Sequence, residues 1–381
     1  MLTANGRIVW SRRRWYSVET GSSLPLDGLV DAAEATISVG VRDLCCRLNG
    51  NACNFEKAAE NLYRAGQVRL SGETLRQVVE GEGKRALALA QAGVLKPTWT
   101  VADCHTTTPE GREVTRIYLG SDGFTMPLIT EAEKQMRRKK VKEKRQKRGK
   151  KARALPRPKK GADQRWKEAK VVTFYDQTIA HRQVSITRGD CDAAGRLMRR
   201  DAELLDFALA DERVGNVDGG PWIIRQIAKR LAMTATGLDF YHLGDNVHKG
   251  RRISFGEETP EGKAWAEKLL HAAKHGGYEP LWEGLLEWRK KQRGVKRKEA
   301  DRLIHYVTDR RNMIRYPEFL AKGWQIGSGP TESQCRLLPD RIKGPGMRWD
   351  ADNAEAVMAL EAMEQSDQCS QYWRLALAGP N

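Results

Sequence analysis

Three acidic residues stand where a sequence can build a metal-dependent active site. Asp122 and Asp218 each precede a glycine at the end of a strand-like run, VTRIYLGSDG and RVGNVDG. Strand ends that face the start of a helix are where sheet proteins place ligands. Glu332 follows the glycine turn GSGPT and falls in the first turn of a predicted helix. Three carboxylates on separate elements predict oxygen ligands for a hard cation, Mg²⁺ or Mn²⁺, at Asp122, Asp218 and Glu332.

Two such ions about 3.5–4 Å apart can activate a water or a 3′-hydroxyl and stabilise the leaving oxygen of a phosphate. Zinc is not expected, because the seven cysteines are irregularly spaced and form no C-x-x-C pair. Their odd number favours reduced thiols over a disulfide framework. Each acid also has an ordinary interpretation, since Asp-Gly is a common turn and glutamate is common at helix starts. The spacing alone leaves both interpretations open.

Basic residues surround the candidate glutamate. Ser328 or Thr331 is predicted to cap its helix, and a second glycine turn, Gly344-Pro345-Gly346, follows it. An acid ringed by bases on a preset turn favours a metal site that works on phosphates, whereas the alternative is a capped surface helix. The bases that we predict to contact DNA here are Arg336, Arg341, Lys343 and Arg348.

One segment carries most of the net charge. Residues 137–160 hold fifteen Lys or Arg against one acid, Glu143, and the rest of the chain contributes only +3 of the formal +17. Such a segment predicts a disordered or solvated arm and a polyanionic partner, the alternative being a solubilising linker. The bases predicted to bind DNA in this arm are Arg137, Arg138, Lys139, Lys140, Lys144, Arg145, Lys147, Arg148, Lys150 and Lys151.

The first quarter of the chain is predominantly helical in pattern. The runs Phe55–Ala65 and Ser71–Val79, joined by a short turn, are typical of a helix-turn-helix. Its second helix would present Glu73, Thr74, Arg76 and Gln77 to a DNA groove, although any small helical bundle has a similar pattern.

Several motifs occur in a fixed order along the chain. They are GSDGFTMPL (120–128), KEAKVVTFY (167–175), VGNVDGGPWI (214–223), LDFYHL (238–243), and GWQIGSGPTES (323–333) with KGPGMRW (343–349). On these motifs, from about Trp15 to Met363, the chain resembles bacterial insertion-sequence DDE transposases of the ISKra group. It is more distantly similar to Mutator-like transposases.

The resemblance implies an α/β fold: an RNase H-like mixed sheet with helices and an all-helical insertion, preceded by a small helical, helix-turn-helix-like domain. Asp122 and Asp218 match the catalytic aspartates and Glu332 the catalytic glutamate, with two Mg²⁺ or Mn²⁺ ions. The implied domains are residues 1–26 (a basic, aromatic segment), 27–95 (helical, DNA-binding), 112–257 (catalytic, with the basic arm 136–162), 258–320 (insertion) and 321–381 (the end of the catalytic domain).

A further pair, Asp239 and His242, matches an acid-plus-histidine motif of these enzymes. The pair lies in the predicted strand GLDFYHL and is expected to brace the site or hold the DNA strand. An ordinary core histidine is the alternative for His242. Asp239 also competes with Asp218 as the second metal ligand, although Asp218 fits the motif better.

The resemblance also has a departure. Relatives open with a cysteine-paired zinc ribbon, whereas the matching region near Ser17–Gly21 has no cysteine, so residues 1–26 are interpreted as a degenerate remnant. The expected function is cleavage and transfer of double-stranded DNA at element ends, as a homodimer or higher oligomer, in the bacterial cytoplasm near the nucleoid. The alternatives are a catalytically silent or domesticated DNA-binding derivative and a structure-selective nuclease. No apolar run approaches membrane-spanning length, and no membrane partner is expected.

Overall fold

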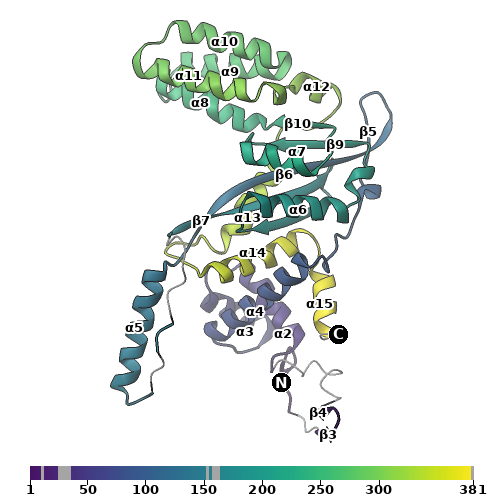
Figure 1. Cartoon of the computed structure of the whole chain (residues 1–381), viewed down its shortest axis with the longest axis vertical. Helices are drawn as coiled ribbons and strands as arrows, with labels where there is room; N and C mark the ends of the chain where they lie inside the picture. The colour runs from purple at the N-terminus through teal and green to yellow at the C-terminus, as the bar shows by residue number, and fades with distance from the viewer. Residues whose placement is uncertain (10–12, 25–35, 152–153, 157–163, 379–381) are drawn as a thin grey trace.

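The computed structural model of the chain describes residues 1–9, 13–24, 36–151, 154–156 and 164–378. Its shape is elongated (Figure 1). A helical domain that contains the N-terminus lies at one end, a mixed sheet lies in the middle, and a layer of helices lies at the other end. A basic helix projects sideways from the body.

The sheet is built around one long strand. β6 (Glu113–Pro127) pairs antiparallel with β7 (Trp166–Asp176), which pairs antiparallel with β8 (Arg182–Thr187). On its other edge β6 pairs in parallel with β9 (Glu212–Val217), and β9 with β10 (Ala235–Leu238). A short strand, β5 (His105–Thr107), also pairs with β6. The order β10-β9-β6-β7-β8 is compatible with the implied RNase H-like mixed sheet.

The prediction that a strand ends at Asp122-Gly123 was wrong. β6 runs on to Pro127, which pairs with Trp166, so Asp122 lies within a strand. The long β7 supplies a ladder partner for every residue from Ile117 to Pro127, and this pairing overrides the turn preference of Asp-Gly. The other strand ends as predicted, at Val217, directly before Asp218.

Alternate residues of β6 face two different cores. Ile117 and Leu119 point toward α6 (Cys191–Leu204) and α7 (Pro221–Arg230), which lie on one face of the sheet. Phe124 and Met126 face the opposite way and pack with residues of α13 (Gly329–Asp340) and α14 (Ala351–Gln365). This alternation is the period-2 pattern of a strand covered on both faces. α6 is followed by a 3₁₀ turn at Phe207–Leu209.

A glycine lets α13 approach the central strand closely. A Cβ added at Gly120 would overlap Thr331 Oγ1 and lie 2.9 Å from Thr331 Cβ. Since contacts below 3.0 Å are essentially never found for a real Cβ, only glycine allows this approach. Thr331 immediately precedes Glu332, so this contact fixes the height of the candidate glutamate above the sheet.

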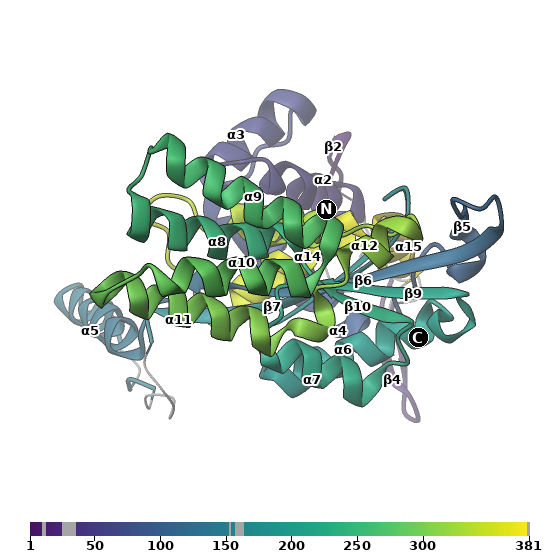
Figure 2. The same ribbon diagram turned by 90° about the horizontal axis from the view of Figure 1, so that it is seen from above.

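The helical layer begins earlier than the predicted insertion at residue 258. GLDFYHL is not one strand, because β10 ends at Leu238, Asp239 caps the next helix, and α8 (Phe240–Phe255) follows. α8 packs against α9 (Pro260–Gly276) and α11 (Gly294–Asp309). α10 (Tyr278–Lys290), which lies between α9 and α11 in the sequence, packs against both of them. A short helix, α12 (Tyr316–Ala321), leads back to the sheet. Figure 2 shows these helices gathered on one side of the molecule.

The N-terminal helices form one packed body with the sheet domain. α2 (Val39–Gly50), α3 (Phe55–Gly66) and α4 (Gly72–Gln91) share a hydrophobic core with α14 and α15 (Cys369–Ala378). A Cβ added at Gly83 of α4 would lie 2.6 Å from the carbonyl carbon of Ala356 and closer still to its oxygen. Buried Glu82 accepts from Arg42 at 2.6 Å and from the Tyr372 hydroxyl. The two domains are therefore joined by apolar packing and by buried polar contacts.

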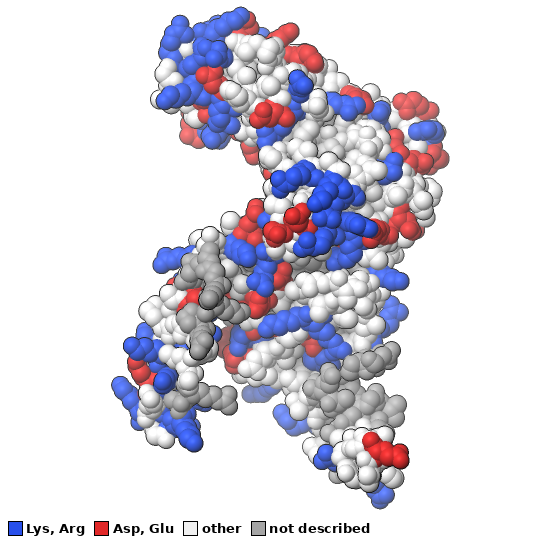
Figure 3. Space-filling view, viewed as in Figure 1, with Lys and Arg blue, Asp and Glu red and all other residues white. Residues whose placement is uncertain are grey.

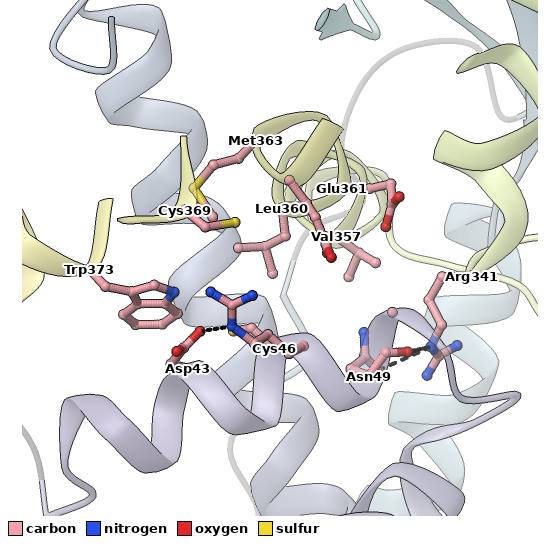
Figure 4. A pocket seen from close by; sticks show the side chains of 13 residues that line it. Asp43, Cys46, Asn49, Arg341, Val357, Leu360, Glu361, Met363, Cys369 and Trp373 are labelled. Carbon is pink, nitrogen blue, oxygen red and sulfur yellow. Dashed lines mark hydrogen bonds and ion pairs between the residues drawn. The ribbon is translucent and has the colours of Figure 1, made fainter. Parts of the chain in front are cut away.

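The junction itself leaves little space. Figure 4 shows Arg341 reaching α2, where its Nε donates to the carbonyl oxygen and Oδ1 of Asn49 at 3.1 and 3.0 Å. The cavity beside these residues measures about 20 Å³, which is close to the room that one water molecule needs. Such close packing is not compatible with N-terminal helices that are only loosely tethered to the sheet domain.

The basic arm is ordered over part of its length, where it forms the helix α5 (Glu131–Lys147). Thr130 and Glu133 form a capping box at its start. No α5 side chain is buried. Its root is attached to the body because Arg348 pairs with Glu133, and Lys134 Nζ lies 2.5 Å from Asp350 Oδ2.

Two small hairpins, β1 (Leu2–Thr3) with β2 (Gly6–Arg7) and β3 (Trp15–Ser17) with β4 (Gly21–Ser23), lie near the N-terminus. Among the described helices, none has the length and apolar character needed to cross a bilayer.

Candidate active site

The sheet brings Asp122 and Asp218 to the same level. The last paired residues of the parallel strands β6 and β9 are Leu119 and Gly215. Each aspartate lies three residues beyond its member of this pair, at the point where β9 leaves the sheet and β6 continues. The negative charge of Asp218 contributes to the raised pKa of Asp122, after the larger effect of burial.

Asp122 is half-buried, and its surroundings shift the pKa of its carboxyl in opposite directions. Burial has the largest effect and raises the pKa of this carboxyl, and the charge of Asp218 raises it further. A hydrogen bond from the Gly123 backbone N–H, at 2.6 Å, and one from the Cys335 thiol lower it. The net shift is upward, as expected for an acid that has a like charge beside it. Cys335 was not predicted as a site residue, and its only signal is its place three residues after Glu332 on the same helix.

Glu332 reaches this position from α13. Its side chain is 42% exposed, and its Oε1 lies 3.4 Å from Ser328 Oγ. Burial raises the pKa of Glu332, as do the negative charges of Asp239 and, more weakly, Asp122. The three predicted acids, Asp122, Asp218 and Glu332, stand on three different elements, and among the described residues their ligand atoms are not all within 4.8 Å of one another.

Asp239 has a different role from the other acids. It is fully buried and caps α8, where Oδ1 accepts from the backbone N–H groups of Tyr241 at 2.6 Å and His242 at 3.0 Å. Its Oδ2 accepts from both the backbone N–H and the hydroxyl of Ser328. Burial works to raise the pKa of Asp239, but contacts from His242 and Ser328 outweigh it and lower the pKa to about 2. With both oxygens engaged, this carboxylate fits a positioning residue and does not favour Asp239 in place of Asp218 as a ligand.

The same contacts revise the role of Ser328. It stands at the N-cap of α13 as predicted, but its hydroxyl makes no cap hydrogen bond and donates to Asp239 instead. Asp239 therefore ties the start of α8 to the start of α13, the helix that carries Glu332.

His242 lies between two carboxylates. Its Nδ1 is 3.3 Å from Glu332 Oε1 and 3.7 Å from Asp239 Oδ1. The neighbouring Asp239 carboxylate raises the pKa of His242 to about 9, against the opposing effect of burial. The imidazole is thus protonated at neutral pH and faces Glu332, which does not match the alternative of an ordinary core histidine.

Among the described residues, potential ligand atoms of Asp239, His242 and Glu332 lie within 4.8 Å of one another. A metal at this trio would have to displace the proton of His242 and the hydrogen bonds of Asp239. The donor chemistry of Asp122, Asp218 and Glu332 fits a hard divalent cation better. All three are partly exposed carboxylates, and one oxygen of Asp218 accepts only a local bond, from Gly220 N at 2.7 Å. An excess of acids over bases in this region favours Mg²⁺ or Mn²⁺.

Two residues of the helical layer also border the site, and sequence reasoning missed both. Arg310 packs over Gly219, where an added Cβ would lie 2.7 Å from Arg310 Cδ; Gly219 also has a φ of +75°. Tyr306 is half-buried, and burial together with the charges of Asp218 and Asp239 raises its pKa to about 12. Both residues lie far along the chain from Asp218, so no local pattern connects them.

The predicted DNA contacts fall into two groups. The arm residues are exposed or partly exposed, and Arg336 and Lys343 are exposed as well. Figure 3 shows the blue of Lys and Arg on the arm, over α6 and α7, and at one end of the helical layer.

Three predicted DNA contacts are engaged by partners within the chain, which competes with the role that we expected for them. Arg341 is only 7% exposed, and its guanidinium stacks 4.5 Å above the Phe55 ring. Arg348 holds Glu133 and the carbonyl oxygen of Leu128. Arg76 pairs with Glu73 and Glu80 on its own helix. Burial or pairing within the chain leaves these guanidinium groups little capacity for phosphate.

The helix-turn-helix interpretation also needs correction. α4, its second helix, packs along α14 and buries Leu75, Val79 and Ala86. Of its groove-facing candidates, Arg76 and Gln77 both donate to Glu73. The helix is thus part of the domain junction, and its polar face is largely satisfied by itself.

Comparisons with known proteins add little. No family model matches the chain, and no curated protein sequence matches it. Among solved structures, the chain is similar to the Drosophila P element transposase strand transfer complex. That match covers 90% of this chain and 81% of the other, with 10% sequence identity and a TM-score of 0.29.

Proposed function

We propose that this chain is a DDE-type transposase that cuts DNA at the ends of an insertion sequence and transfers the strands. One observation supports the proposal: Asp122 and Asp218 lie at the same level where the parallel strands β6 and β9 separate, and the helix that carries Glu332 packs against β6. Carboxylates on the central strand, the adjacent strand end and a helix above them suit phosphoryl transfer with two metal ions.

In this proposal Asp122, Asp218 and Glu332 hold two Mg²⁺ or Mn²⁺ ions. Bound there, the ions would supply an activated water or 3′-hydroxyl and would stabilise the leaving oxygen. The neighbouring residues Asp239 and His242 position the candidate ligand Glu332. Asp239 fixes Ser328 and thereby the start of α13, while protonated His242 pairs with Glu332 and orients its carboxylate.

The basic arm supplies affinity for DNA. The helix α5 projects away from the body, and none of its Lys and Arg side chains is buried, so that they can follow a phosphate backbone. If six of them contact phosphates, binding should weaken on the order of 10³-fold between 50 and 200 mM salt. Action on paired ends as a homodimer or larger assembly, in the bacterial cytoplasm, belongs to the same proposal.

A catalytically silent, DNA-binding derivative is the second candidate. The first cysteine of the chain is Cys45, so the region that resembles a zinc ribbon has no metal ligands of that kind. This candidate predicts salt-sensitive DNA binding without metal-dependent cutting.

The deciding experiment uses a supercoiled plasmid that carries the DNA flanking this gene, incubated with Mg²⁺, Mn²⁺ or EDTA. We expect metal-dependent cuts at the element ends that are lost in Asp218→Ala and Glu332→Gln. Asp340→Asn, an exposed acid at the end of the same helix, is the matched control and should cut normally. Cutting by Asp218→Ala at the wild-type rate would contradict the assignment. No cutting by folded, DNA-binding wild-type protein would favour the silent derivative.

A further inference from the structure

An exposed tryptophan stands at the start of β7, beside the end of the strand that carries Asp122. Trp166 begins β7 and is 57% exposed, although most large aromatic side chains of the described core are buried. It lines a cavity of about 590 Å³ together with Arg165, Lys343 and the turn 344–346. An indole face among basic side chains is the arrangement with which proteins bind unpaired nucleic acid.

The cavity continues on the other side of the same loop. A second cavity, of about 500 Å³, shares Gly346, Met347 and Arg348 with the first, and extends to Arg137 at the root of the arm. Its other lining residues include Phe55 and Trp349. We call the two cavities with their shared loop, residues 343–348, the loop groove.

The loop groove lies along the strand that carries Asp122. The Trp349 N–H donates to the Pro127 carbonyl oxygen at 3.1 Å, which places the loop beside the end of β6. Lys343 Nζ lies 5.1 Å from the centre of the Phe124 ring, two residues from Asp122. The five residue-to-residue steps from Asp122 to Pro127 span about 17 Å at ~3.4 Å each, which is the axial length of about five base pairs.

The charges of the groove favour a polyanion over a protein. Arg165 and Lys343 are exposed, and within the part of the chain that the structure describes neither has an acidic partner. The acids that line the groove are already used, since Glu80 pairs with Arg76 and Asp350 with Lys134.

We propose that the loop groove binds an unpaired strand of DNA beside the cleavage site. Trp166 stacks on one base, and Arg165 and Lys343 contact the flanking phosphates. This inference rests on the proposed function, because it assumes that the substrate is DNA opened near the scissile phosphate. Duplex DNA keeps its base faces stacked inside the helix, so the indole face selects the unpaired strand.

The test measures binding of a fluorescein-labelled oligothymidylate and of a hairpin duplex by anisotropy, with EDTA present so that no cleavage occurs. Trp166→Ala should weaken binding of the single strand roughly 5- to 150-fold and leave duplex binding unchanged. Trp166→Phe keeps a ring and should restore most of the affinity. Trp15→Ala removes a tryptophan that is 62% exposed elsewhere and should have no effect.

A charge variant gives a second readout if Trp166→Ala folds poorly. Lys343→Gln should reduce the slope of log affinity against log salt for the single strand by about 0.7. Lys298→Gln, which removes an exposed lysine of α11, should leave that slope unchanged.

Two outcomes would contradict the proposal that the loop groove binds an unpaired strand. One is equal single-strand affinity in wild type and Trp166→Ala, and the other is an equal loss of affinity for the single strand and the duplex. These outcomes are independent of the cleavage assay. If the wild-type protein does not cut DNA but Trp166→Ala still loses single-strand binding selectively, the groove stands and the transposase proposal falls. If the protein cuts DNA and Trp166→Ala binds normally, the reverse holds.

Discussion

The closest approach of α13 to the sheet predicts a severe effect of one added methyl group. In Gly120→Ala, the new Cβ would overlap Thr331 Oγ1 and lie 2.9 Å from Thr331 Cβ and 3.3 Å from its Cγ2. Ordinary van der Waals contact begins at 3.4 Å. Even if the Thr331 hydroxyl rotates away, the helix must therefore move by about 0.5 Å, and without that rotation by about 1 Å or more.

Two quantities should change. Overpacking of this kind lowers the free energy of unfolding by about 1–3 kcal/mol, because the buried strand and helix are close-packed. Displacement of Glu332 by about 1 Å should slow metal-dependent cleavage on the order of 10²-fold. Urea denaturation measures the first quantity, and the rate of plasmid cleavage measures the second.

The controls separate the clash from the extra methyl group. Gly81→Ala adds the same group to α4 where nothing lies within 4 Å, so neither stability nor cleavage should fall. Adding Thr331→Ala to Gly120→Ala removes the overlapping hydroxyl and should recover part of both losses. The reasoning is refuted if Gly120→Ala unfolds at the wild-type urea concentration, since the helix would then have room that the structure does not show.

Three further predictions concern buried or paired charges. Glu82→Ala should lower the free energy of unfolding by about 3–5 kcal/mol in urea titrations, because it removes a buried carboxylate that pairs with Arg42 and accepts from the Tyr372 hydroxyl; a loss below 1 kcal/mol would contradict this. In EDTA, the stabilisation that His242 gains from Asp239 should be complete below its ordinary pKa of 6.5 and disappear as pH rises through about 9. Urea titrations of wild type and His242→Gln would therefore converge at high pH, and a gap that widens would exclude the pairing. Arg341→Gln should lower stability with little change in the salt dependence of DNA binding, whereas Lys139→Gln should reduce that slope by about 0.9 without loss of stability; the opposite pattern would reverse their assigned roles.

Local patterns in the sequence were sufficient to predict several of the helices and strands. The helices predicted over Phe55–Ala65 and from Ser71 onward form as α3 and α4, because apolar spacing and capping residues act within a few turns. The strand that ends before Asp218 forms as predicted for the same reason. The charge of the arm is also a property of composition, and it requires an exposed location whatever the fold.

The local patterns failed where distant segments decide the outcome. Asp122-Gly123 has the sequence of a turn, but β7 pairs with β6 beyond it and keeps the strand extended. Arg341 and Arg348 have the composition of a DNA-binding surface, but α2 and α5 pack against them and use their charges. The pairing partners lie from tens to hundreds of residues away, so no window of sequence contains the competing interaction.

The sequence by itself determined which residues can do chemistry: the three acids, the histidine beside them and the excess of bases. Only the tertiary structure decided which of these meet. The register of two parallel strands sets Asp122 and Asp218 at the same level of the sheet, and Gly120 admits α13, the helix that carries Glu332, close to the central strand. Strand register and helix approach depend on packing between segments far apart in the chain, and that information is not local to any motif.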